Sequence, residues 1–165
     1  MLIFNSCNNK FINDYDSDVT YICPAEIKKE VYRYASMYND VETVYELGGQ
    51  DAIRAALKMD CSGLVVMCYF YATENSNYKL MFDDARVIDL YNNFTILTET
   101  PEQGDLIFMG DDDISHIAIF EKIENGNVYF IDATLKENIN GVSKRFYPLG
   151  SEKIKAFGIM RLYHK

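Results

Sequence analysis

The sequence predicts an α+β domain, with helices in its first half and an antiparallel sheet in its second half. Two observations support this fold class. Apolar residues recur at helical spacing before residue 93, whereas short runs rich in Ile, Phe, Val and Tyr follow from residue 104. Helices followed by strands are typical of α+β proteins. A length of 165 residues suits one domain, which we expect to span residues 1–165.

The first half is predicted to hold an irregular entry segment followed by helices. Residues 1–23 are polar and rich in Asn and Asp, so we expect no regular structure there. Pro24 is tolerated in a first helical turn and predicts the start of a helix, and the glycines at 48 and 49 break this pattern. Further helices are expected over three ranges: a short one over residues 51–57, a strong one over 60–72 and a third over 83–92.

The second half is predicted to form about five antiparallel strands. We expect them over residues 104–109, 115–123, 128–135, 142–148 and 156–163. Groups of turn-forming residues separate these runs, at 110–113, 125–127, 140–141 and 150–151. The N-terminal helices would pack on this roughly five-stranded sheet.

The charge balance disfavours several kinds of partner. There are 16 basic and 25 acidic residues, which gives a formal net charge of −9. An acidic surface repels nucleic-acid phosphates and anionic membranes, so we expect neither as a partner. No apolar run reaches the ~20 residues that would span a bilayer. The apolar start of the chain lacks a basic region and is too short for a complete export signal, so localisation is left open.

The four cysteines and two histidines argue against a metal site. The cysteines, Cys7, Cys23, Cys61 and Cys68, do not form two CxxC pairs, and the histidines are not spaced as ligands, so we expect no metal and no cofactor. Cys7 and Cys23 could pair in an oxidising compartment, although free buried thiols are the simpler reading.

The local sequence around Cys61 is typical of a nucleophile at a helix start. Asp60 is a good N-cap residue and an apolar run follows it, so Cys61 should lie in the first helical turn. Outward-pointing N–H groups and the helix dipole favour a thiolate there. Gly63 would allow another backbone or a substrate to approach closely. The alternative is a small core cysteine.

Two residues of the predicted sheet could complete a catalytic set. His116 begins a half-buried strand and could act as the base of Cys61, whereas His164 lies near the chain end, where we expect a solvated tail. Asp132 lies inside an apolar run of the next strand, where a carboxylate needs a partner, and could orient His116. A strand-end aspartate that bonds a turn is the alternative.

Strand parity tests this pairing. In an antiparallel pair, the numbers of any two directly paired residues add up to the same register sum. Two residues on the two strands point to the same face only if the sum of their own numbers and this register sum are both even or both odd. A regular two-residue turn at Asn125 and Gly126 gives 125 + 126 = 251, which would place His116 and Asp132 on opposite faces. The pairing therefore requires an odd-length loop or a β-bulge.

Five segments together resemble the NlpC/P60 family of cysteine peptidases. Residues 60–65, Asp-Cys-Ser-Gly-Leu-Val, match the family's DCSGLV motif. Residues 104–108 resemble its GDLVFF strand, residues 115–120 its HVGIY strand, residues 130–133 its following IHA segment, and residues 45–49 its Y-x-W-G-G motif. Each match is modest alone, but the ordered set over about residues 40–135 is specific.

The resemblance implies a papain-like fold and hydrolysis of peptide bonds in bacterial peptidoglycan stem peptides. Carried over by position, Cys61 would be the nucleophile, His116 the base and Asp132 the orienting residue. The expected substrate-binding residues are Tyr45, Asp60 and Ser62. The family also implies a cell-envelope or secreted location and a peptidoglycan peptide as partner; an inhibitor protein is unknown.

The sequence departs from the family at three places. Aspartate replaces the usual third-position histidine at 132, leucine replaces tryptophan at 47, and residues 101–103 lengthen a proline–glycine turn. Other functions therefore stay open. They are a Cys–His acyltransferase or amidase on the same scaffold, a secreted antibacterial amidase effector, and an inactive binding module that keeps the groove.

Overall fold

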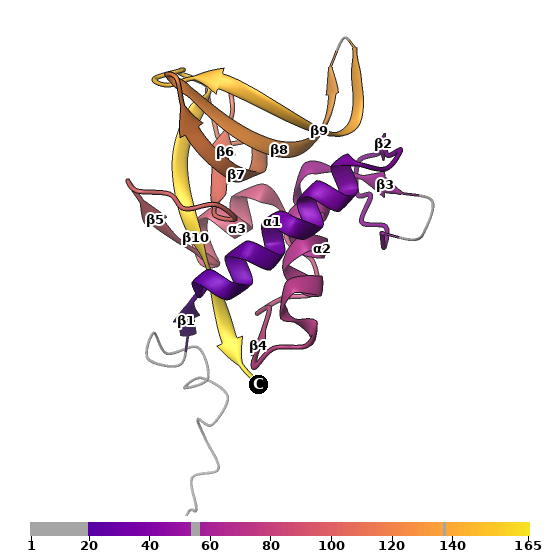
Figure 1. Ribbon diagram of the computed structural model, residues 1–165, viewed down its shortest axis with the longest axis vertical. Coiled ribbons are helices and arrows are strands. Elements are labelled where there is room, and N and C mark those ends of the chain that lie inside the picture. The colour runs from indigo at the N-terminus through magenta and orange to yellow at the C-terminus, as the bar shows by residue number, and fades with distance from the viewer. Residues whose placement is uncertain (1–19, 54–56, 137) are drawn as a thin grey trace, which may run out of the picture.

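The computed structural model describes residues 20–53, 57–136 and 138–165. Within these ranges, the five predicted strands are present and pair antiparallel as part of one sheet (Figure 1). They are β6 (Leu106–Met109), β7 (His116–Glu124), β8 (Asn127–Lys136), β9 (Ile139–Pro148) and β10 (Ile154–His164). Their spatial order is β10-β6-β7-β8-β9, so four consecutive strands form a meander and the last returns beside the first. The predicted α+β class is confirmed.

The sheet is larger than the predicted five strands. Three short strands, β1 (Thr20–Ile22), β4 (Tyr78–Lys79) and β5 (Thr95–Thr98), also pair antiparallel with β10, giving eight strands among the described residues. The long β10 offers enough backbone N–H and C=O groups to pair with all of them. The prediction of an irregular segment is therefore wrong for residues 20–22; residues 1–19 lie outside the described part.

Two of the predicted helices are confirmed. Helix α1 (Ala25–Asn39) begins directly after Pro24, which is its N-cap, and buries an apolar face that includes Ile27, Val31, Ala35 and Tyr38. Helix α2 (Cys61–Glu74) buries ten of its fourteen residues. Such a helix is apolar on all sides because neighbours cover it on all sides. Figure 1 shows α1 and α2 packed against each other beside the sheet.

Two local predictions are wrong. Helix α3 (Val87–Asn93) begins four residues later than expected, with Arg86 as its N-cap and an Arg86–Asp89 ion pair closing its first turn. The described residues of the predicted helix over 51–57 are not helical. There the Asp51 side chain accepts a hydrogen bond from the backbone N–H of Lys58, and a two-stranded parallel sheet forms between β2 (Val44–Tyr45) and β3 (Lys58–Met59). Local side-chain bonds of this kind compete with helix formation.

Two apolar clusters hold the fold together. The larger one lies between the helices and one face of the sheet and includes Leu64 of α2, Ile117 of β7 and Ile131 of β8. The smaller one contains residues of the opposite strand parity, such as Ala118 and Phe130. Helix α2 packs against both β7 and β8.

Candidate active site

Cys61 is the first residue of α2, as predicted. The Asp60 side chain caps the helix: its Oδ1 accepts a hydrogen bond from the backbone N–H of Gly63 at 2.7 Å. Cys61 is buried, with 7% of its surface exposed. The thiol therefore lies at the end of α2 that carries the unpaired N–H groups and the positive end of the helix dipole.

The loop before β3 is locked onto this helix start. The other Asp60 carboxylate oxygen accepts from the backbone N–H of Gly48 at 2.7 Å, and the Asp60 N–H donates to the carbonyl of Gly49 at 2.9 Å. Gly63 is required for this contact, because a Cβ at that position would lie 2.0 Å from the Gly49 carbonyl oxygen. The predicted close approach at Gly63 is thus made by the protein's own backbone.

His116 and Asp132 form a direct contact. His116 Nε2 lies 2.5 Å from Asp132 Oδ2. The Asp132 side chain is fully buried, whereas 22% of the His116 side chain is exposed. Because Nε2 is occupied by the carboxylate, Nδ1 is the ring nitrogen left for the Cys61 thiol, which is near enough to act on the pKa of the imidazole.

A β-bulge brings these two residues to one face. The β7–β8 hairpin has a two-residue loop, because Glu124 pairs with Asn127, and its register sum there is 251. The register shifts between Phe120 and Lys122, and beyond the shift Phe120 pairs with Phe130, a sum of 250. The structure therefore contains the bulge that the parity argument required, and the even register beyond it places His116 and Asp132 on one side of the sheet.

The pKa of His116 is raised to about 9. Burial opposes the charged imidazolium, but the interactions with Asp132 and then with Cys61 outweigh it. Burial likewise opposes ionisation of Asp132, yet hydrogen bonds from Arg145 and His116 hold its pKa below the ordinary value. The site therefore favours a positively charged imidazole beside an ionised carboxylate.

Arg145 of β9 is a member of this cluster that the sequence did not single out. Its Nε donates to Asp132 Oδ1 at 2.9 Å, and its Nη2 donates to Asp132 Oδ2. Arginine is common on exposed strands, so its residue type alone carried no signal. Its place in the predicted sheet could have identified it. An inward-facing arginine needs a partner, and the neighbouring strand carries the buried Asp132.

The three predicted substrate-binding residues lie around the start of α2. Tyr45 of β2 is half-buried, and burial, followed by the charges of Cys61 and Asp60, raises the pKa of its hydroxyl. Ser62 donates a hydrogen bond to Asp60 at 3.0 Å. The oxygens of Asp60 are thus engaged by groups of the protein, and its part in binding a substrate stays a prediction.

The other titratable candidates lie elsewhere. We expected His164 in a solvated tail, but it is the last residue of β10. There it pairs with Tyr78, and its ring contacts the rings of Tyr21 and Tyr78. Cys23 and Cys68 are buried free thiols. Burial raises the pKa of Cys23 to about 12 and that of Cys68 well above its ordinary range, so neither suits a nucleophile. Cys7, the proposed partner of Cys23, lies outside the described residues.

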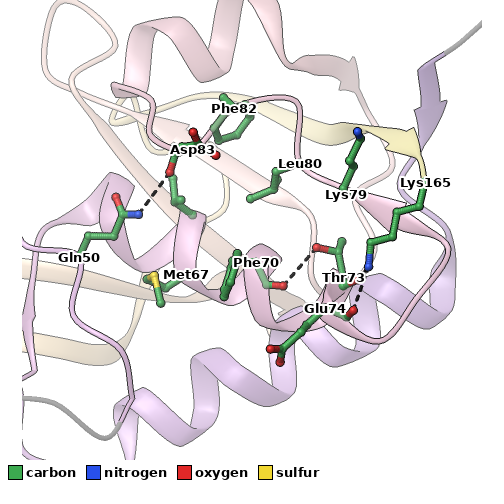
Figure 2. A pocket seen from close by; sticks show the side chains of 11 residues that line it. Gln50, Met67, Phe70, Thr73, Glu74, Lys79, Leu80, Phe82, Asp83 and Lys165 are labelled. Atoms are coloured by element: carbon green, nitrogen blue, oxygen red, sulfur yellow. Dashed lines mark hydrogen bonds between the residues drawn. The ribbon is translucent and has the colours of Figure 1, made fainter.

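Two hollows flank the elements of the site. A small pocket of about 230 Å³ opens beside His116 and includes Ser115, Lys136, Tyr147 and Lys153 in its wall. A hollow of about 590 Å³ runs along α2, lined by Phe70, Leu80, Phe82 and other residues (Figure 2). Of the two proposed catalytic side chains, His116 lines the small pocket and Cys61 lines neither hollow.

The described part of the chain lacks two further features. Over residues 20–53, 57–136 and 138–165, no three His, Cys, Asp or Glu side chains gather as metal ligands. Within the same ranges, no helix is long and apolar enough to cross a membrane.

The cysteine at the start of α2, the His116–Asp132 pair on β7 and β8 and the α+β architecture are typical of a papain-like fold. The sequence model of the NlpC/P60 family matches residues 42–151. The chain therefore belongs to the NlpC/P60 family. No curated protein sequence matches it.

Several solved structures share the fold. The resuscitation promoting factor interacting protein RipA is 19% identical with a TM-score of 0.51; 86% of this chain and 67% of that one are covered. RipD from Mycobacterium tuberculosis, a non-catalytic NlpC/P60 domain protein adapted to peptidoglycan binding, is 16% identical with a TM-score of 0.50, covering 82% and 98%. Ly7917, solved with the hydrolysing product of MDP, is 8% identical with a TM-score of 0.55, covering 81% and 62%.

Proposed function

We propose that the protein is a cysteine hydrolase that cleaves amide bonds in peptidoglycan stem peptides. One observation carries the proposal: the His116 imidazole is held by the buried Asp132, and the Cys61 thiol at the start of α2 is near enough to that imidazole to raise its pKa. A nucleophile, a base and an orienting carboxylate on three separate elements are what thiol-dependent acyl transfer requires.

The first chemical step is attack by the Cys61 thiolate on the amide carbonyl. With its pKa raised to about 9, His116 is protonated at neutral pH and supports a thiolate–imidazolium pair. The backbone N–H groups at the start of α2 would stabilise the oxyanion, together with the hydroxyl of Tyr45. The sulfur–carbon bond forms as the carbonyl π electrons move to oxygen.

The second and third steps release the products. When the tetrahedral intermediate collapses, the carbon–nitrogen bond breaks and His116 gives its proton to the leaving amine. The neutral imidazole then takes a proton from water, whose oxygen attacks the thioester. The carboxylic acid product leaves, and the Cys61 thiolate and protonated His116 are restored.

The substrate class rests on the family and on similar structures. RipD has a peptidoglycan-binding function, and Ly7917 holds a product of MDP hydrolysis. A location in the cell envelope or outside the cell would give this chain access to the same polymer. The acidic surface agrees with a substrate other than nucleic acid.

The test is digestion of purified peptidoglycan fragments followed by mass spectrometry. We expect wild-type protein to release peptides that gain one water at a single type of amide bond. Cys61→Ala should be inactive, and Cys68→Ala, which removes a buried thiol from the same helix, should retain turnover. Products joined to an added amine or lipid instead of water would indicate an acyltransferase, and equal digestion by Cys61→Ala would contradict the proposal.

A peptidoglycan-binding module without activity is the second candidate. The similarity to RipD favours it, since RipD keeps the fold without catalysis. The His116–Asp132 contact, with Cys61 near enough to act on the pKa of His116, supports an enzyme. Saturable binding of peptidoglycan fragments with no mass change over long incubations would decide for the binding module.

A further inference from the structure

We propose that Arg145 is a positioning residue of this site, which holds Asp132 in place and supplies a constant counter-charge while His116 gains and loses its proton. This inference rests on the proposed function, because it assigns Arg145 a part in the chemistry of Cys61 and His116.

The geometry joins three strands through one carboxylate. Arg145 of β9 donates from Nε to Asp132 Oδ1 at 2.9 Å and from Nη2 to Oδ2, the oxygen that also contacts His116. Two parallel N–H···O bonds fix both the position and the plane of a carboxylate. Asp132 therefore cannot rotate away from His116 without breaking both bonds to Arg145.

The guanidinium also lies near two aromatic rings. Its Cζ lies 5.3 Å from the ring centroid of Phe130 and 5.7 Å from that of Tyr147. Only 12% of the Arg145 side chain is exposed. Planar contacts with aromatic rings are a property of arginine that lysine does not reproduce. The positioning group is thus preorganised before any substrate binds.

The catalytic cycle explains why a second cation is needed. During the proposed reaction His116 gives its proton to the leaving amine and becomes neutral. Without Arg145, Asp132, with 0% of its side chain exposed, would then be a buried charge with no cationic partner. Arginine keeps its charge at every pH in question, so Arg145 balances Asp132 in both states of His116.

Arg145 also limits how tightly His116 holds its proton. The charged or titratable groups that act on Asp132 or Arg145 are His116 of β7, Tyr147 of β9 and Lys153. Cys61 of α2 acts on His116, and Lys136 of β8 donates a hydrogen bond to the Tyr147 hydroxyl. Of these, His116 shares Asp132 directly with Arg145. Removing the guanidinium leaves the imidazolium as the one cation on the carboxylate, so the His116 proton should be held more tightly.

Imidazole titration by NMR tests this without any substrate. The chain has two histidines, so the exposed His164 serves as an internal reference. In Arg145→Gln we expect the pKa of His116 to rise by about one unit, the scale of losing a nearby charge. Arg145→Lys, which retains a cation, should restore most of the shift. Lys144→Gln, on the same strand and pairing with Glu121, should leave the pKa of His116 unchanged.

Kinetics on the peptidoglycan fragment give the second readout. We expect Arg145→Gln to lower kcat about 10-fold or more with little change in KM, and Arg145→Lys to recover part of that loss. A His116 pKa that is unchanged or lowered in Arg145→Gln would overturn the inference. So would a wild-type kcat in that variant. If wild-type protein cleaves nothing, the proposed function fails, and the His116 titration still decides the role of Arg145.

Discussion

His116 Nε2 and Asp132 Oδ2 lie 2.5 Å apart on adjacent strands because one bulge in β7 corrects the register of their hairpin. The two-residue loop alone would have placed the side chains on opposite faces. Bulges often re-aim a side chain next to an active site, and here the bulge separates the hairpin tip from the part of the sheet that carries the site. The contact is thus a product of register and not only of strand order.

Removing the charge of Asp132 should disable the site. Asp132→Asn retains the size of the side chain but loses the anion that favours the imidazolium, so the pKa of His116 should fall. We expect kcat to drop about 100-fold or more, as for other triads with this change. Steady-state kinetics with peptidoglycan fragments measure the effect, and a kcat within threefold of wild type would exclude Asp132 from the mechanism.

The same variant should also lose stability. Asp132→Asn leaves the largely buried Arg145 without its anionic partner, which costs on the order of 3 kcal/mol of unfolding free energy. Chemical denaturation at neutral pH measures it. Lys144→Gln, which breaks the exposed pair with Glu121, is the matched control and should cost less than about 1 kcal/mol. Equal losses for the two variants would show that the buried Asp132–Arg145 pair contributes no more to the unfolding free energy than an exposed ion pair does.

Stability should fall as the pH rises from about 6.5 to about 9. The pKa of His116 is raised in the folded protein, so the stabilisation is complete below the unfolded value and is lost as pH passes through the folded value. We expect a loss on the order of 1–3 kcal/mol over this window. The comparison is with His116→Gln, whose unfolding free energy should lack this component. Parallel pH profiles of the two proteins would contradict the assigned pKa.

Asp60 should prove important for stability as the cap of α2. Its carboxylate accepts hydrogen bonds from Gly48, Ser62 and Gly63, so Asp60→Ala should lower the unfolding free energy by about 2 kcal/mol. Asp60→Asn retains an acceptor for the Gly63 N–H and should lose less. Denaturation curves separate the two. If Asp60→Ala instead unfolds like wild type but fails to bind substrate, the predicted substrate role outweighs the cap.

Much of the site could be predicted from the sequence because its signals are local. An Asp followed by Cys and an apolar run predicts a capped helix with the thiol in its first turn, and α2 begins there. A buried-looking aspartate in an apolar strand predicts a partner, and Asp132 has two. The fold class followed from the order of helical and strand patterns.

The parts that sequence did not predict depend on tertiary contacts. Arg145 acts through a neighbouring strand, so no spacing along the chain marks it. The strands β1, β4 and β5 are short and form because β10 offers them partners, which local propensity does not show. Residues 140 and 141 looked like a turn, but both lie within β9, where Asn140 Oδ1 accepts from the Tyr45 N–H.

The reactivity of Cys61 tests the thiolate–imidazolium pair most directly. Wild-type protein is treated with iodoacetamide at pH 6, and each cysteine-containing peptide is quantified by mass spectrometry. We predict that Cys61 is alkylated at least about tenfold faster than the buried Cys23 and Cys68, and that His116→Gln abolishes this difference. Slow alkylation of Cys61 in wild-type protein, or the same rate with and without His116, would contradict the pairing on which the proposed hydrolase depends.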